Sequence, residues 1–149
     1  DTRAEADGAE ARANRQRLIA LAASGGVAAV ADDMVPKLLG ATTRHSRPAI
    51  EARLRALIGA NQVPAVQSAL HAMMTRDDST NLLPSIQVPT LVLVGDEDTL
   101  TPPALSRSMA EAIPAATLVV ISESGHLPNM EQPEAFNAEV LGFLRQAFL

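Results

Sequence analysis

Residues Val88–His126 read VPTLVLVGDEDTLTPPALSRSMAEAIPAATLVVISESGH, and this stretch decides the fold. It contains two short apolar runs, Leu91–Val94 and Leu118–Ile121, which do not alternate with polar residues and are rich in β-branched side chains. Such runs are typical of parallel strands that are covered on both faces. Between them, the tripeptide TPP at 101–103 predicts a helix start, with threonine as the cap and proline in the first turn. The stretch therefore predicts a β-α-β unit with parallel strands and a right-handed crossover.

Two side chains able to carry chemistry follow these strands. Asp98 lies in the turn after the first strand and His126 in the loop after the second. Because open α/β sheets place their ligands at the carboxyl ends of the strands, we expect the two residues to share one edge of the sheet. A carboxylate bound to one imidazole nitrogen fixes the tautomer and lets the other nitrogen act as a general base. Spacing alone leaves His126 open between this role and that of an ordinary loop histidine.

The segments GDEDTLTPP (95–103) and SGHLPNMEQPEAF (124–136) closely resemble the C-terminal part of α/β-hydrolase fold enzymes. The resemblance is strongest from Val88 to Leu144. Within the family, this sequence is most similar to the branch of 3-oxoadipate enol-lactonases and esterases. It implies that Asp98 is the acid and His126 the base of a Ser-His-Asp triad, 126 − 98 = 28 residues apart. The family pattern picks Asp98 over Asp96. We interpret Asp96 and Glu97 as turn residues with solvated charges.

The family's nucleophile elbow, G-x-S-x-G, occurs nowhere in the 149 residues. The resemblance therefore implies an α/β fold that is the C-terminal portion of such an enzyme, with a helical cap at 1–80 and a β-α-β-α part of the core at 81–149. The expected function is to supply the acid, the base and the lid of a serine hydrolase for carboxylic esters or lactones. On this hypothesis the chain alone is inactive. The alternative is a non-catalytic, truncated module that acts in binding or assembly.

The first half of the chain predicts four helices and no strand. Ala4–Ala23 is rich in good helix formers, Gly25-Gly26 should break this helix, and helical spacing resumes as far as Leu39. We expect a polar loop at 41–47, followed by helices that begin at Pro48 and Pro64. The resemblance implies that these helices form a cap that roofs the active site.

The chain ends with a predicted helix over 133–148 that carries all three phenylalanines, Phe136, Phe143 and Phe148. Large rings supply the most buried area per residue, so we expect this helix to pack against the sheet.

Other candidate residues are weaker. Leu100 and Leu127, each just beyond a triad candidate, are the best candidates to line a substrate pocket. The methionines Met34, Met73 and Met74 are read as core residues, with a place facing an apolar substrate as the alternative. We interpret the two remaining histidines as core or surface residues, because neither has a second ligand four residues away: His45 and His71. We expect neither a metal nor a cofactor.

Composition excludes several classes of partner. The net charge is −5 and the pI about 5.1, which argues against nucleic acid. The chain has no cysteine, and no run of residues approaches the ~18 consecutive apolar side chains of a membrane span. The first residues are acidic and do not resemble a signal peptide. The chain does not begin with Met, which fits a fragment, a processed chain or a chain that lacks its start. We therefore expect a cytoplasmic protein that acts on a small molecule.

The predicted first strand, Thr90–Val94, has an apolar edge without lysine or internal proline. Such an edge is a template for another chain. We expect the strand to pair with a missing N-terminal half of the enzyme or with its own copy about a two-fold axis, so that the chain is not a free monomer.

Overall fold

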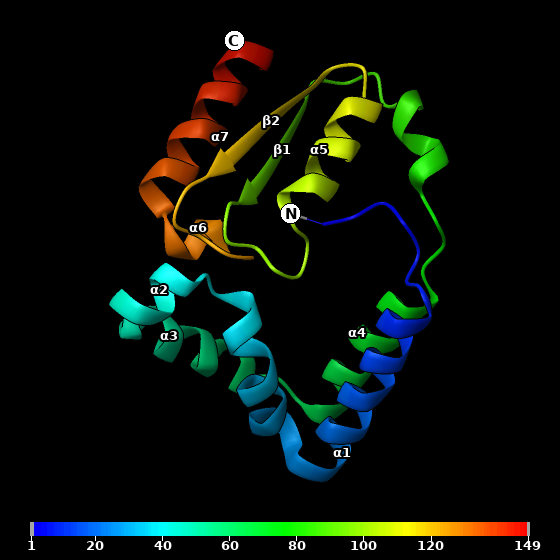
Figure 1. Cartoon of the computed structure of the whole chain (residues 1–149), viewed down its shortest axis with the longest axis vertical. Helices are drawn as coiled ribbons and strands as arrows, with labels where there is room; N and C mark the ends of the chain where they lie inside the picture. Colours follow the sequence, from blue (N-terminus) through cyan, green and yellow to red (C-terminus); the bar gives the residue numbers. More distant parts are fainter. Residues whose placement is uncertain (1, 149) are drawn as a thin grey trace.

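The computed structural model describes residues 2–148, and the side chains of residues 2–147. A helical part and a part that contains the sheet lie one above the other in Figure 1. The helical part consists of α1 (Ala9–Leu38), α2 (Ala41–Ser46), α3 (Pro48–Gly59) and α4 (Val63–Thr75). The sheet part consists of β1 (Thr90–Gly95), α5 (Pro103–Ala112), β2 (Ala116–Ile121), α6 (Pro128–Glu131) and α7 (Pro133–Phe148). The 3-10 helix η1 (Thr80–Ser85) follows α4 in the chain and packs against α5 in the sheet part (Figure 1).

Helix α1 is bent into two arms. Gly26 has φ +70° and ψ −174°, a conformation that is open almost only to glycine, and it interrupts the helical backbone. The predicted break at Gly25-Gly26 is therefore confirmed as a sharp bend, which forms the lowest point of the chain in Figure 1. Pro36 lies in the last turn, and the helix ends two residues later at Leu38. The helix packs against α4 and α3.

By length and composition alone, α1 is apolar enough to cross a membrane, with a mean hydropathy of 1.6 in its most apolar window. The sequence prediction, based on runs of consecutive apolar residues, did not single it out. Leu18, Ala22, Val30 and Val35 of this helix are buried inside the protein. A core helix passes the same test of length and composition, so these properties do not assign α1 to a membrane.

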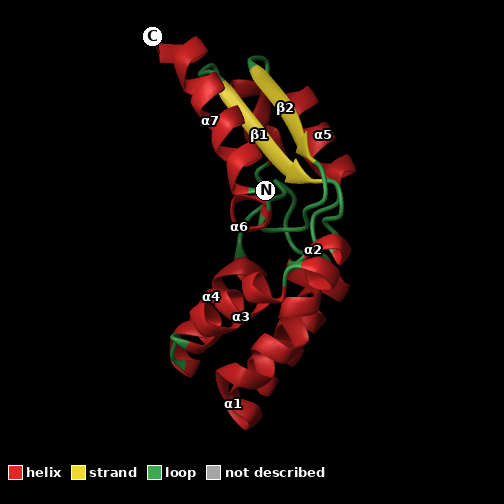
Figure 2. Ribbon diagram, turned by 90° about the vertical axis from the view of Figure 1, so that its left-hand side faces the viewer, coloured by secondary structure: helices red, strands yellow, loops and turns green. Residues whose placement is uncertain are grey.

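The sheet has two strands among the described residues. Strands β1 and β2 are parallel, with register from Thr90 opposite Ala116 to Gly95 opposite Ile121. Helix α5 packs against both strands and α7 against β2. In the view of Figure 2, α7 and α5 lie to either side of the two strands. In β1, Val92 and Val94 are buried and Leu91 and Leu93 are half-buried, but Val120 of β2 is 40% exposed. The prediction that both faces are covered is therefore wrong for β2.

The segment 41–47, predicted as a loop, forms the short helix α2. The reason is a contact from far along the chain: the Glu97 carboxylate accepts hydrogen bonds from the Thr42 backbone N–H, at 2.8 Å, and from the Thr42 hydroxyl. Amide N–H groups in the first turn of a helix have no partner within the helix, and a carboxylate stabilises them. The residues of the segment 41–47 alone do not predict this contact, because its partner Glu97 is far away in the chain.

An apolar cluster ties the two parts together. Its buried members are Ala31, Val35, Leu39 and Leu54, and Leu127 from the loop after β2 and Met130 from α6 pack against it. The loop that carries His126 is thus packed onto the second arm of α1. In the last helix, α7 has the predicted bounds, and Phe136 and Phe143 are half-buried; the side chain of Phe148 lies outside the described residues.

Candidate active site

Asp98 and His126 lie side by side at the carboxyl ends of the two parallel strands. His126 Nδ1 is 2.9 Å from Asp98 Oδ2. Asp98 is 3% exposed, and its Oδ1 accepts hydrogen bonds from the backbone N–H groups of Leu100, at 2.8 Å, and Thr101, at 3.0 Å. The predicted juxtaposition at one sheet edge is therefore present in the fold.

The surroundings of Asp98 favour its ionised form. Burial raises the pKa of this carboxyl, but hydrogen bonds from His126 and Thr101 outweigh burial and hold the pKa below its ordinary value. An ionised Asp98 only accepts hydrogen bonds, so it favours the His126 tautomer that carries its proton on Nδ1. The lone pair of that tautomer lies on Nε2, as a general base requires.

Thr101 belongs to this group, although the sequence predicted it as the cap of α5. Its hydroxyl donates to Asp98 Oδ2 at 2.7 Å and lies 3.2 Å from His126 Nδ1. Helix α5 instead begins after Pro102 and has no side-chain cap. The signal in the sequence is the spacing of three residues from Asp98 to Thr101, because an Asp side chain in a turn readily accepts hydrogen bonds from backbone N–H groups two and three residues further on.

Glu131 is a second residue that sequence reasoning missed. It is fully buried, and its carboxylate accepts hydrogen bonds from the backbone N–H groups of Gly125, at 2.9 Å, Leu127, at 3.1 Å, and Gly40, at 2.7 Å. Two of these donors flank His126. The His126 backbone N–H itself donates to the Leu38 carbonyl at 2.9 Å. The backbone around the histidine is thus fixed to α6 and to the end of α1.

Close backbone approach explains a glycine next to the histidine. A Cβ atom on Gly125 would lie 2.4 Å from the backbone nitrogen of Gly40. Real Cβ atoms do not come this close to backbone, so the loop can reach the end of α1 only with glycine at this position.

Asp96 and Glu97 are the other two acidic residues in the turn that contains Asp98. Asp96 is exposed, whereas Glu97 is not a freely solvated turn residue. Asp96 Oδ1 lies 3.4 Å from the Ser124 backbone N–H. Glu97 is half-buried, and the hydrogen bond from the Thr42 hydroxyl, with its backbone N–H, lowers the pKa of Glu97. The interpretation of Glu97 as a solvated charge is therefore wrong. Neither residue contacts His126 through a described hydrogen bond; the contact belongs to Asp98.

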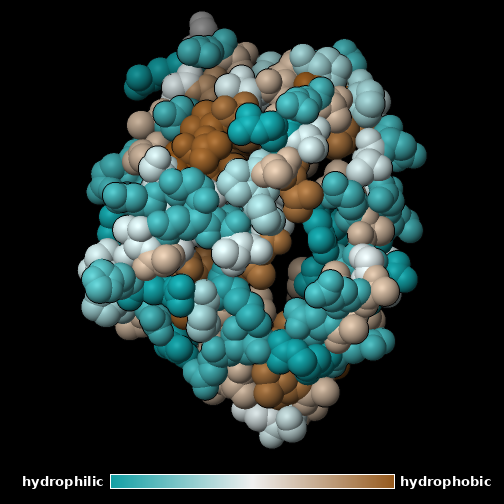
Figure 3. All heavy atoms as spheres, viewed as in Figure 1, coloured by the Kyte–Doolittle hydropathy of each residue, from teal (hydrophilic) through white to brown (hydrophobic). Residues whose placement is uncertain are grey.

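A cavity of about 410 Å³ opens beside His126, between the sheet part and the two arms of α1. Figure 3 shows the molecule hollowed between the two parts, with apolar atoms in the wall. Leu100 lines the cavity, whereas Leu127 packs against the apolar cluster instead. Met34 and Met73 line it as well, so these two methionines face the cavity rather than the core. The remaining lining residues are Arg3, Ala11, Asn14, Arg15, Leu18, Val30, Leu38, Leu70 and Thr101.

The other histidines lie away from this site. His45 in α2 and His71 in α4 are both exposed. Among the described residues, no three His, Cys, Asp or Glu side chains are grouped as a metal site requires.

In a comparison with known protein families, residues 24–133 match the family described as alpha/beta hydrolase fold. A thermophilic esterase from Thermogutta terrifontis, solved with malate bound, superimposes with a TM-score of 0.94 at 38% identity, over 99% of this chain and 54% of that one. The enol-lactonase from Burkholderia xenovorans LB400 superimposes with a TM-score of 0.85 at 28% identity, over 97% of this chain and 54% of that one.

A curated relative gives a similar result. The putative carbamate hydrolase RutD of Pseudomonas savastanoi pv. phaseolicola is 39% identical over 75 residues, which are 50% of this chain and 29% of that protein. The chain thus spans about half the length of the two solved structures, 54% of each.

Proposed function

Because the chain belongs to the α/β-hydrolase fold family, we propose that it supplies the acid, the base and the lid of a serine hydrolase for carboxylic esters or lactones. The observation that carries the proposal is the 2.9 Å contact between His126 Nδ1 and Asp98 Oδ2, at the wall of a cavity. The relatives named esterase and enol-lactonase support the reaction class, since both names describe transfer of an acyl group to water.

In the proposed mechanism, a serine outside these residues is the nucleophile. His126 Nε2 takes the hydroxyl proton as the serine oxygen adds to the ester carbonyl, and Asp98 stabilises the imidazolium that forms. The tetrahedral intermediate collapses, the bond to the alkoxy oxygen breaks, and His126 returns the proton to that oxygen. The same histidine then takes a proton from water, which attacks the acyl-serine and releases the acid.

The helices α1–α4 are proposed as the lid. Both arms of α1 contribute to the cavity wall, through Arg15 and Leu18 on one arm and Val30 and Met34 on the other. A wall of this kind separates the ester from bulk water and strengthens the electrostatic contacts inside the site. The bounds 1–80 and 81–149 for lid and core are part of this proposal.

Ester hydrolysis tests the proposed function. The polypeptide encoded by the whole reading frame should hydrolyse p-nitrophenyl butyrate, and His126→Ala should abolish this turnover. Residues 1–149 alone should show no triad-type activity, because no serine elbow lies within them. If the whole polypeptide were inactive, the non-catalytic module would be the better account. Turnover by residues 1–149 that disappears in His126→Ala would contradict the missing nucleophile.

A further inference from the structure

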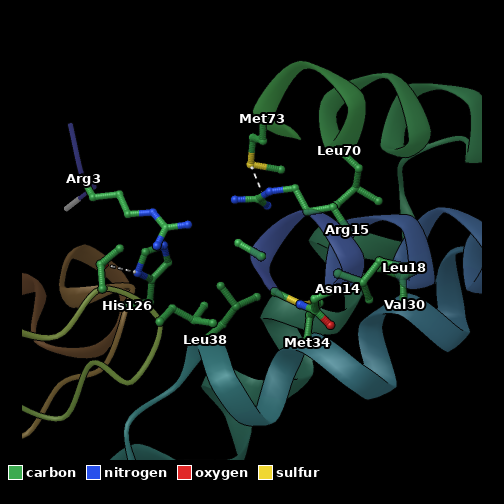
Figure 4. A pocket seen from close by; sticks show the side chains of 13 residues that line it. Arg3, Asn14, Arg15, Leu18, Val30, Met34, Leu38, Leu70, Met73 and His126 are labelled. Carbon is green, nitrogen blue, oxygen red and sulfur yellow. Dashed lines mark hydrogen bonds between the residues drawn. The ribbon is translucent and has the colours of Figure 1, made fainter. Parts of the chain in front are cut away.

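The turn that carries Asp98 and the loop that carries His126 are both attached to one short segment of the helical part, residues 38–42 at the junction of α1 and α2. The His126 backbone N–H donates to the Leu38 carbonyl oxygen at 2.9 Å. Figure 4 shows the side chains of Leu38 and His126 next to each other at the wall of the cavity that both of them line. The candidate base is thus attached to this junction through its own backbone.

The candidate acid is attached to the same junction through its neighbour in the chain, Glu97. The Glu97 carboxylate accepts hydrogen bonds from the Thr42 backbone N–H, at 2.8 Å, and from the Thr42 hydroxyl. The Glu97 backbone N–H donates to the Ser124 carbonyl oxygen at 2.9 Å, in the loop that carries the base. Glu97 therefore bonds to the helical part through its side chain and to the loop of the base through its backbone.

Close backbone packing makes these attachments stiff. A Cβ atom on Gly40 would lie 2.8 Å from the Gly125 backbone nitrogen, and one on Gly95 would lie 2.2 Å from the Gly125 carbonyl oxygen. Gly40 lies in the junction, Gly95 ends β1 and Gly125 lies in the loop after β2. Because densely packed atoms leave no room for one segment to shift alone, a movement of the junction is passed on to the segments that carry Asp98 and His126.

The contact between Glu97 and Thr42 is charge-assisted. The hydrogen bond from the Thr42 hydroxyl, opposed by burial, lowers the pKa of Glu97, so this carboxylate is ionised near neutral pH. Hydrogen bonds to an ionised acceptor are roughly twice as strong as those between neutral groups. Loss of this contact should therefore release the turn of Asp98 from the junction.

We propose that Glu97 is a positioning residue of the acid–base pair: its bonds to Thr42 hold the turn of Asp98 against the junction and so keep Asp98 in contact with His126. Glu97 acts through the backbone of its turn and exchanges no proton with the substrate. The effect on turnover rests on the proposed function, whereas the contact between Asp98 and His126 belongs to the chain itself.

The state of the His126 ring tests the proposal without a substrate. Nitrogen-15 NMR shows which ring nitrogen carries the proton, and only a proton on Nδ1 can be donated to Asp98 Oδ2, 2.9 Å away. In the wild-type chain, at a pH at which the ring is neutral, we expect the Nδ1–H form. Thr42→Val keeps the shape of the side chain and removes the hydroxyl. It should lower the ratio of the Nδ1–H form to the Nε2–H form roughly fivefold, the equivalent of one lost hydrogen bond.

Thr42→Ser is the matched control, because it keeps the hydroxyl, and it should leave the ratio at the wild-type value. The exposed rings of His45 and His71 give the reference for a histidine in solvent in the same spectra. If Thr42→Val left the ratio unchanged while Asp98→Asn altered it, Glu97 would not position the acid and the proposal would be overturned.

Glu97→Gln removes the charge and turns an NH₂ group toward one of the two Thr42 donors, so it should lower the ratio at least as far as Thr42→Val. The control is Asp96→Asn in the same turn, where the side chain is exposed and the ratio should not change. Circular dichroism checks that each variant is folded, and the Thr42 variants decide the matter if Glu97→Gln unfolds. Equal spectra for Glu97→Gln and Asp96→Asn would contradict the proposal.

Positioning and catalysis fail separately in these experiments. In the polypeptide encoded by the whole reading frame, Thr42→Val should lower kcat for p-nitrophenyl butyrate roughly fivefold and leave KM unchanged, because the acid–base pair and not ester binding is affected. A change in KM alone would show that the contact serves the cavity wall, and would refute the positioning role while the hydrolase function stands. If Thr42→Val changed the ring in the chain but the whole polypeptide hydrolysed no ester, the positioning role would stand and the hydrolase function would be refuted.

Discussion

Glu131 shows how one buried side chain positions the candidate base. Its carboxylate accepts three backbone N–H groups, two of them next to His126 and one at the end of α1. Glu131→Gln replaces one accepting oxygen by an NH₂ group that faces a backbone donor. We expect it to lower the free energy of unfolding by roughly 2–3 kcal/mol, since a buried charged acceptor is lost. Urea unfolding measures this.

The matched control is Glu134→Gln, at an exposed position in the first turn of α7. It should change the free energy of unfolding by less than about 0.5 kcal/mol. If the two variants had equal stability, Glu131 would not hold the histidine loop.

The ionisation of Asp7 makes the stability of the folded protein depend on pH. The hydrogen bond from Arg15, followed by that from Arg3, lowers the pKa of Asp7 below its usual 3.8. A carboxyl with a lowered folded-state pKa stabilises the protein above its unfolded pKa, and this stability is lost as the pH falls through the folded value. Asp7→Asn should therefore lower Tm at pH 7 and make the decline of Tm below about pH 4 shallower than in the wild type.

Thermal melts from pH 7 to pH 2 test this prediction. Asp77→Asn, at an exposed aspartate, serves as the control. The claim fails if Asp7→Asn and the wild type have parallel Tm profiles.

Whether the sequence predicted a site residue depended on where its partners lie. Asp98 and His126 were predicted because each follows a strand, and parallel strands bring such residues to one edge. Glu131 and Glu97 were not, because their partners are far away in the chain: Gly40 lies 91 residues from Glu131, and Thr42 lies 55 residues from Glu97. A carboxylate that binds distant backbone N–H groups looks like a surface charge in the sequence.

The bend in α1 is the feature at the scale of elements that shapes the cavity. Gly26 has φ +70° and ψ −174°, and a Cβ built on it would meet no atom within 4 Å. The cost of Gly26→Ala is therefore backbone strain alone, and we expect a loss of roughly 1–3 kcal/mol in the free energy of unfolding. Chemical denaturation measures it.

Gly142→Ala is the matched control, because Gly142 lies inside α7 and also has open space around it. Alanine is the better helix former, so this variant should gain about 0.5–1 kcal/mol. The same sign for both substitutions would contradict the role of Gly26 in the bend.

Elements were predicted well where local signals mark their ends. Prolines opened α3, α4 and α7 as expected. Helix α2 was missed because the Glu97 carboxylate, not a local cap, stabilises its first turn. The incomplete burial of β2 was missed for a similar reason, since the covering of a strand depends on neighbours that the strand's own residues do not specify.

At the scale of the whole molecule, the small sheet predicts association. Within the described residues, β1 pairs only with β2, and two strands make a poor independent sheet. Figure 3 shows apolar atoms gathered over α7 and β2, where Val120, Leu141 and Leu144 are exposed. We expect the purified chain to be an oligomer, paired through β1 with its own copy, in multi-angle light scattering. A monomer at micromolar concentration with a cooperative melt would contradict this.

The activity of the whole polypeptide tests the central claim, that Asp98 orients His126 as the base of a hydrolase. The measurement is kcat for p-nitrophenyl butyrate in Asp98→Asn and Asp96→Asn variants of the polypeptide encoded by the whole reading frame. Asparagine at 98 favours the wrong histidine tautomer, so kcat should fall by roughly 10⁴-fold. Asp96 is exposed and does not contact His126 through a described hydrogen bond, so Asp96→Asn should leave kcat within about threefold of the wild type. A large loss in Asp96→Asn with little loss in Asp98→Asn would contradict the assignment.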